Sequence, residues 1–327
     1  MAYIFTTISI SVVYYCCLLQ KNLILRYLED IMNDWNNIRK IKQFDVLLDY
    51  AFLYRKCIFM FIISYNSYVS LMFLLALKPF LLDLMKPLNE TRPRTLIIPM
   101  NWYNGQEAHF LKILIFQLVI SIILGLGVIS GLSLYILFLQ HTCAMFHITS
   151  SLLDNILDVK EKNIKVIDDR IIYKRIINVI KFHKRSIQCI DLFNNIFNVA
   201  SFIQMICVIC FIGIAVISIF DEYKSSSDIS SLGLSILYVI FHLIWVFVVF
   251  HIGQHLQNIS EAAFYKAYET PWYLFSHQSQ RLITFMIAQS YKPIYLSIGK
   301  MFMASHEHFA WIIRSSISYA MALYSLR

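Results

Sequence analysis

The stretch ILIFQLVISIILGLGVISGLSLYILFLQHTCAMFHITSSLL, residues 113–153, contains no Asp, Glu, Lys or Arg. A helix rises ~1.5 Å per residue and needs roughly 20 residues to cross the ~30 Å of hydrocarbon in a bilayer. This stretch is therefore long enough to span a membrane and to continue beyond it. Further uncharged runs occupy residues 1–20, 57–77, 192–220 and 229–260. Together the runs predict five membrane-spanning helices.

The composition also excludes an ordinary soluble domain. Of the 327 residues, 58% are hydrophobic and 15% are charged, and the mean hydropathy is +0.62. Soluble domains are only about 45–50% apolar and about 25% charged. The apolar runs are too continuous for the alternating strands of a membrane barrel. The predicted fold class is all-α, a polytopic bundle of membrane helices.

The orientation of the bundle follows from its basic residues. Lys and Arg number seven in residues 21–56, three in 83–109, nine in 160–185, one in 221–231 and four in 256–300. Because cytoplasmic segments carry the excess of Lys and Arg, the three richer segments are predicted to lie inside the cell. Facing anionic lipid headgroups there, they account for the net charge of +8. We therefore expect a lipid bilayer and no nucleic acid as partner.

This orientation places Met1 outside, although no signal peptide or earlier helix would carry it there. We therefore expect the chain to begin near the second helix of a larger bundle, with one further span before it.

Residues 26–56 and 163–193 are rich in charge but keep apolar residues at helical spacing. Such segments either extend the membrane helices and pack together below the bilayer, or form solvated helical loops. In the first segment the apolar positions are Tyr27, Ile31, Trp35, Ile38, Leu47 and Leu48.

The end of the chain combines a Pro-Gly segment, KPIYLSIGKMFMAS at residues 292–305, with a short apolar run. Lys300, Glu307 and Arg314 are spaced by seven, so on one helix they would form a polar stripe. The uncharged residues 315–326 give only ~18 Å of helix, too short to span a bilayer alone. Such a helix lines a pore, or lies buried in the bundle with an internal ion pair.

Two internal patterns leave alternatives open. His251 and His255 lie four apart, a spacing that either holds a metal ion or places two polar side chains near the cytoplasmic end of a span. Gly125, Gly127 and Gly131 either allow helices to approach closely or widen a pocket. No cofactor motif is present, and we expect no cofactor and no bound metal.

The C-terminal segment FMIAQSYKPIYLSIGKMFMASHEHFAWIIRSSISYAMALYSLR resembles the terminal signature of insect odorant receptors. LMKPLNETRPR, LQHTCAMFHI and HIGQHLQNISEAAFYKAYETPWY resemble further segments of that family. The terminal signature is matched by Met286, Lys292, Pro293, Leu296, Gly299, Lys300, Phe309, Ser318 and Tyr319.

The resemblance implies a seven-helix subunit, with six spans present in this chain. It implies assembly with odorant receptor co-receptor subunits into a tetrameric, non-selective cation channel gated by small apolar volatiles. The implied location is the plasma membrane of olfactory sensory neurons. Residues 1–270 would form the bundle with the ligand pocket, and residues 271–327 an anchor helix at about Trp272 to Tyr291 followed by a pore helix. Pro293 would break the last helix, and Gly299 would let the chain re-enter it.

Two other functions remain as alternatives. A gustatory receptor channel has a similar pore helix but a different terminal motif. A polytopic membrane enzyme or transporter would need convergent acids and histidines at one depth, or two repeated halves with broken helices. Neither feature is found in the sequence.

The resemblance also implies where the ligand and the gate lie. The pocket lies among the outer halves of the implied helices two, three, four and six, and counting from the outer ends of the spans nominates its residues. They are Phe5, Ser9, Ser70, Phe73, Leu77, Phe116, Ile120, Tyr238, Phe241 and His242. On the last helix, Tyr319, Ala322 and Leu326 share one face. They would close the pore as rings of apolar side chains, or pack between helices.

The orientation can be tested by mapping glycosylation. Asn89 begins the sequon Asn-Glu-Thr on the predicted outer side, and Asn258 begins Asn-Ile-Ser on the inner side. Mass spectrometry of the protein from insect cells should find a glycan on Asn89 and none on Asn258. A glycan on Asn258 would overturn the orientation.

Overall fold

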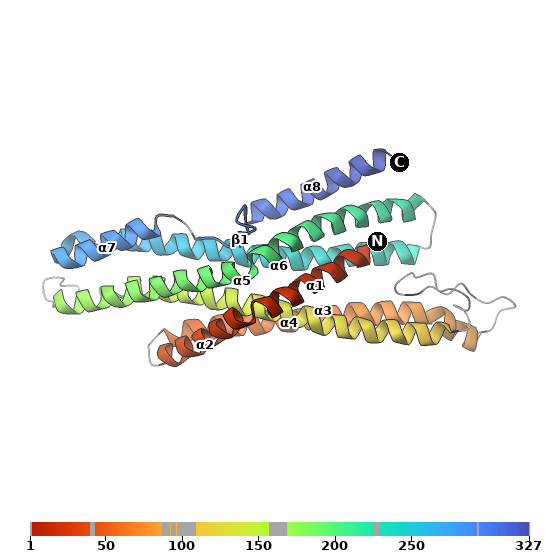
Figure 1. The fold of residues 1–327 in the computed structure, drawn as a ribbon, viewed down its shortest axis with the longest axis horizontal. Helices are drawn as coiled ribbons and strands as arrows, with labels where there is room; N and C mark the ends of the chain where they lie inside the picture. The colour runs from red at the N-terminus through yellow and green to blue at the C-terminus, as the bar shows by residue number, and fades with distance from the viewer. Residues whose placement is uncertain are drawn as a thin grey trace.

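The computed structural model describes residues 2–39, 43–86, 92, 96, 109–156, 169–224, 229–292 and 294–326. Asn89 and Pro293, for which the sequence gives predictions, lie outside these residues. The chain forms an elongated bundle of long helices, with α7 at one end and α8 running toward the other (Figure 1). We call these the α7 end and the α8 end of the bundle.

The bundle is almost entirely helical, which confirms the predicted fold class. Its elements are α1 (Ala2–Leu19), α2 (Lys21–Ile38), α3 (Phe44–Met85), α4 (Phe110–Asp154), α5 (Asp169–Lys224), α6 (Ile229–Glu269), the 3₁₀ turn η2 (Trp272–Leu274), α7 (His277–Ser290), the strands β1 (Ser297–Ile298) and β2 (Phe302–Met303), and α8 (His306–Ser325).

Within the described residues, α3, α4, α5 and α6 are each long and apolar enough to cross a membrane. A fifth span is obtained if α1 and α2, which meet at a bend of 75°, are taken together. These five correspond to the five predicted from uncharged runs. The most apolar window of α3 is only 6% buried. A surface so apolar and so exposed within one chain is suited to contact with lipid.

The largest core lies where the second half of α4 is surrounded by other helices. Residues 138–146 of α4 are all buried, as expected for a helix enclosed on every side. The amphipathic α2 packs here, because its side chains Tyr27, Ile31 and Ile38 are buried in this core. The prediction of extensions that pack together is thus confirmed for α2. It was wrong for Leu48 on α3, which is 44% exposed.

The glycines of α4 allow close helix packing at two positions and leave more room at a third. A Cβ atom on Gly125 would lie 2.3 Å from the ring of Tyr65, and one on Gly131 would lie 2.5 Å from Val13. A larger residue at Gly125 would push against the Tyr65 side chain of α3, and one at Gly131 would push against Val13 of α1, so α4 could not pack as closely on these two helices. Gly127 has more room, since its nearest neighbour, Ile10, is 3.7 Å away.

The chain between α6 and α8 differs from the prediction. Instead of one anchor helix over Trp272 to Tyr291, the chain forms the turn η2 and then α7, which ends at Ser290. Gly299 does not lead back into a helix. Together with Lys300 and Met301 it forms the three-residue turn between β1 and β2, in which Gly299 and Lys300 have φ values of 65° and 59°. Glycine adopts a positive φ without strain.

The turn removes Lys300 from the predicted polar stripe. Only Glu307 and Arg314 lie on α8, because this helix begins at His306. The spacing of seven between Lys300 and Glu307 therefore has no structural meaning, because residues seven apart share a face only within one continuous helix.

Two asparagines of α5 hold the β1–β2 hairpin in place. The side-chain oxygen of Asn198 accepts hydrogen bonds from the backbone N–H of Lys300, at 2.9 Å, and from the hydroxyl of Ser297, at 3.3 Å. The side-chain oxygen of Asn194 accepts the backbone N–H of Ser297 at 3.1 Å. The strained αL conformation of Lys300 is thus compensated by hydrogen bonds from a neighbouring helix.

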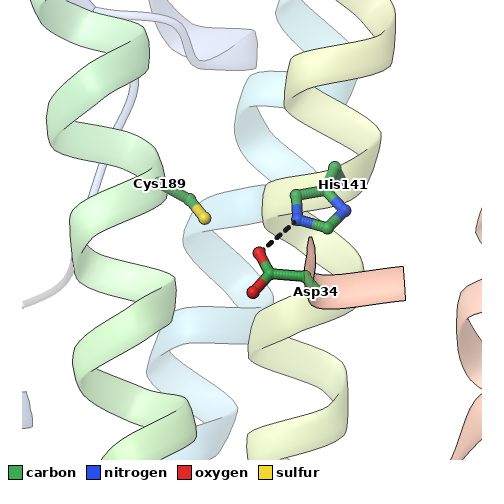
Figure 2. Close-up of side chains that lie close together, drawn as sticks. All are labelled: Asp34, His141 and Cys189. Carbon is green, nitrogen blue, oxygen red and sulfur yellow. Dashed lines mark hydrogen bonds and ion pairs between the residues drawn. The ribbon is translucent and has the colours of Figure 1, made fainter. Parts of the chain in front are cut away.

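A buried polar cluster joins α2, α4 and α5 in the large core (Figure 2). Asp34 accepts a hydrogen bond from His141 at 3.1 Å and is held by Arg185 through contacts of 2.8 and 2.9 Å. Arg185 also approaches Asp30 at 3.4 Å. Burial alone would raise the pKa of Asp34, but the hydrogen bonds from His141 and Arg185 outweigh this and lower it.

The thiol of Cys189 completes a set of potential metal ligands with Asp34 and His141, whose ligand atoms lie within 4.8 Å of one another. The guanidinium of Arg185 already occupies both oxygens of Asp34. A metal ion there would lie next to the fixed positive charge of Arg185. The cluster therefore acts as an ion-pair lock between three helices rather than as a metal site.

Removing one charge of this lock should destabilise the protein. Arg185→Ala leaves Asp34 and Asp30 partly buried without their cation, which costs on the order of 3 kcal/mol. We expect a lower midpoint of thermal unfolding in detergent, measured by size-exclusion chromatography after heating. The exposed neighbour Lys184 provides the control, since Lys184→Ala should change little. An Arg185→Ala midpoint equal to that of the control would show that the lock does not stabilise the bundle.

Candidate functional site

A cluster of aromatic side chains lies between α3, α5 and α6. We call it the aromatic cluster and define it as Phe61, Tyr68, Phe211, Tyr238, Phe241, His242 and Trp245. It lies toward the α8 end of the bundle, because its α6 members come early in that helix, at the end where α6 begins (Figure 1). All three predicted residues of α6 belong to it.

The cluster is closely connected ring to ring. Tyr68 of α3 stacks on Tyr238 and on Phe241, with both pairs of ring centroids 5.6 Å apart. Phe211 of α5 lies 4.6 Å from His242 and 5.4 Å from Tyr238. Such edge-on and offset contacts are the favoured geometries for aromatic rings. A flat apolar molecule is recognised by surfaces of this kind.

The cluster also carries a few polar atoms. Tyr68 and Tyr238 provide hydroxyl groups, and His242 has its Nδ1 atom 3.1 Å from the backbone oxygen of Tyr238. Binding sites for small molecules are mostly apolar with a small number of polar groups that fix orientation. The cluster has this composition.

Four of its members were missed by the sequence analysis, namely Phe61, Tyr68, Phe211 and Trp245. A signal for them exists in the sequence: Tyr238, Phe241 and Trp245 recur at spacings of three and four, which puts their rings on one face of a helix. Phe61 and Tyr68 are spaced by seven in the same manner. Which helix faces which cannot be read from either pattern.

The remaining predicted pocket residues are not part of this cluster. Phe73 and Leu77 pack with Ala76, Phe110 and Leu114 in a small apolar group between α3 and α4. Phe116 is 53% exposed, and Ser70 is exposed.

Ile120 and Ser9 are half-buried on α4 and α1. The side chain of Phe5 lies outside the described part of the structure. The structure thus brings together Tyr238, Phe241 and His242, and it leaves the other nominated residues dispersed along the helices.

A half-open groove of about 310 Å³ lies between α1 and α4. Gly127 and Gly131 lie at its α4 side, so the absent side chains create part of its space. Its lining includes Ile10, Val13, Tyr14, Leu124 and Leu134. The groove is large enough for a small ligand, and it lies apart from the aromatic cluster.

The two histidines predicted as a possible metal pair point to different partners. His255 lies 3.2 Å from the hydroxyl of Tyr50 on α3. His251 lies with its Nδ1 atom 3.1 Å from Nε2 of His306, the first residue of α8. The pair at spacing four therefore does not converge on one site.

The last helix has two distinct faces. Ile312, Ser316 and Ala320 are buried on α8. This face packs on α5, where a Cβ atom placed on Gly213 would lie 3.7 Å from the backbone oxygen of Ser316. The predicted gate residues lie away from this buried face: Tyr319 is 64% exposed and Ala322 is exposed on α8, and Leu326, which follows the last residue of the helix, is 85% exposed. Packing inside this chain does not explain their positions.

Comparison with known proteins agrees with this architecture. The sequence profile described as "7tm Odorant receptor" matches residues 1–317. Odorant receptor 9a of Drosophila melanogaster is 28% identical over 153 residues, which cover 46% of this chain and 37% of that receptor. The chain thus aligns with little more than a third of the length of this relative.

The fold is shared with solved structures. The insect olfactory receptor OR5 from Machilis hrabei superposes with a TM-score of 0.67 at 12% identity, covering 100% of this chain and 80% of that one. The same receptor in complex with eugenol gives a TM-score of 0.66 at 11% identity and covers 99% and 80%. Since the family profile covers almost the whole chain, this protein belongs to the odorant receptor family.

Proposed function

We propose that the chain is the ligand-binding subunit of an odorant-gated, non-selective cation channel that works together with odorant receptor co-receptor subunits in a tetramer. Membership of a family of receptor channels rules out the alternative of a membrane enzyme. The observation that carries the proposal is the combination of an aromatic cluster on α3, α5 and α6 with a final helix, α8, that exposes Tyr319 and Ala322 away from its buried face. The site of action would be the plasma membrane of olfactory sensory neurons.

The aromatic cluster is the proposed site for the odorant. A volatile that enters it exchanges water or lipid contacts for contacts with stacked rings, and burial contributes ~25 cal/mol per Å² of apolar surface. The solved relative that was captured with eugenol bound an aromatic volatile. By analogy, we expect ligands of this chain to be small, flat and largely apolar, with one polar group for Tyr68, Tyr238 or His242.

Ligand binding would reach the pore through α6. This helix carries four residues of the cluster in its first half, and further along it approaches the beginning of α8 very closely. A Cβ on Gly253 would lie 2.5 Å from the backbone oxygen of Ala304, and Gln254 accepts the backbone N–H of His306 at 3.3 Å. A shift of α6 therefore displaces the first turn of α8. The ligand opens the pore if it fits the shifted arrangement better.

The site can be tested by alanine substitution in cells that express the chain with the co-receptor. Tyr68→Ala and Phe241→Ala each remove a stacked ring, so we expect the odorant concentration for half-maximal current to rise about tenfold. The control is Tyr14→Ala, which removes an exposed ring from the groove between α1 and α4. If Tyr14→Ala shifted the response and the other two did not, the ligand site would lie in the groove.

The gate can be tested on the exposed face of α8. Rings of apolar side chains close a narrow pore by excluding water, so Leu326→Ser should increase the current recorded without odorant. Ile312→Ser places the same side chain on the buried face, where it should lower surface expression and produce no leak. Normal expression of Leu326→Ser with unchanged basal and evoked currents would remove Leu326 from the gate.

A further inference from the structure

Two imidazoles meet where α6 approaches the start of α8. Nδ1 of His251 and Nε2 of His306 lie 3.1 Å apart, and the two ring planes differ by only 8°. Both side chains belong to exposed residues. Fifty-five positions separate them in the sequence, so no local sequence pattern predicts that they meet.

The distance between these nitrogens suits two ligands of one metal ion. Two nitrogens bound to a tetrahedral zinc ion at ~2.0 Å each lie roughly 3.3 Å from one another. The exposure of both rings leaves room for water molecules to complete the coordination. In the ion-free state the same nitrogens share one hydrogen bond, which an ion would replace.

The surroundings hold the two rings in this arrangement. The ring of Phe247, one turn before His251, stacks on both imidazoles, with centroid distances of 5.9 and 5.6 Å. The backbone of His306 is held by Gln254, and Gly253 allows the close approach of Ala304. A ligand pair that is positioned in advance loses less conformational freedom on binding.

This pair is a better metal site than the cluster in Figure 2. There, Arg185 holds both carboxylate oxygens of Asp34, so a metal ion would have to displace a cation from a buried position. No salt bridge among the described residues involves His251 or His306.

We propose that His251 and His306 form a site for a divalent transition-metal ion of the class that prefers imidazole, such as Zn²⁺ or Cu²⁺. A bound ion would link α6 to the first turn of α8. The effect on gating rests on the proposed function, because it requires α8 to line the pore, whereas the binding itself does not.

Binding is tested on the purified full chain. Zn²⁺ is titrated in competition with a chelating dye, and Cu²⁺ is followed by electron paramagnetic resonance, where coordination by two imidazole nitrogens gives a resolved hyperfine pattern. We expect His251→Gln and His306→Gln each to weaken binding by at least about tenfold, since even the loss of an outer-shell partner costs 10–100-fold. Mg²⁺, which prefers oxygen ligands, should not compete.

The matched control is His255→Gln, which removes the neighbouring histidine that contacts Tyr50 instead. It should bind the ions as the unmodified chain does. Size-exclusion chromatography verifies that each variant is folded, and if one of the two ligand variants fails to fold, the other decides the result. Unchanged affinity in the folded ligand variants, or equal weakening by His255→Gln, would overturn the proposal.

Recordings from cells that express the chain with the co-receptor give the second measurement. Zn²⁺ is applied to the cytoplasmic side of the membrane, where the pair is predicted to lie. It should change the odorant-evoked current of the unmodified chain and of His255→Gln, but not that of His306→Gln. Metal binding without any effect on current would leave the site intact and overturn its proposed link to gating. Absence of any odorant response would contradict the proposed function alone, because the binding experiment does not use current.

Discussion

The interior of a bilayer offers a peptide group no hydrogen-bond partner, and this constraint shapes the whole chain. In the long uncharged runs that the structure describes, the backbone forms its hydrogen bonds within helices. The described departure from helix near the bundle's centre is the segment that joins α7 to α8, and there α5 supplies the missing partners through Asn194 and Asn198. The position of α8 thus depends on two amide side chains, and the route from the aromatic cluster to α8 depends on that position.

Packing is distributed unevenly along the bundle, and the uneven distribution suits a receptor. The enclosed half of α4, the buried face of α2 and the ion pair of Asp34 with Arg185 make a dense region that resists deformation. Toward the α8 end the helices are more exposed and meet through aromatic rings. A ligand that inserts between loosely packed helices displaces them against a firm support, and regions of low packing density are where functional motion is found.

Much of the fold could be predicted from the sequence, because span length and hydropathy act within each helix separately. The uncharged run 113–153 indicates α4 with no knowledge of its neighbours. Of the aromatic cluster, the sequence pattern nominated only Tyr238, Phe241 and His242, which share one face of α6. Their neighbours Tyr68 and Phe211 belong to other helices, and no local pattern shows how those helices are rotated. The same reason explains the error at Lys300, where a heptad was extended across a turn, and the missed pair of His251 with His306.

The length of α5 has a mechanical consequence. Its 56 residues make a rod of ~84 Å, far longer than the bilayer is thick. Asn198, which holds the β1–β2 hairpin, lies near the middle of this rod, Phe211 lies on one side of it, and Arg185 lies on the other. If this rod pivoted near its centre, a tilt produced at Phe211 would move the opposite arm the other way. The chain therefore contains one continuous helix that is long enough to connect the two sides of a membrane.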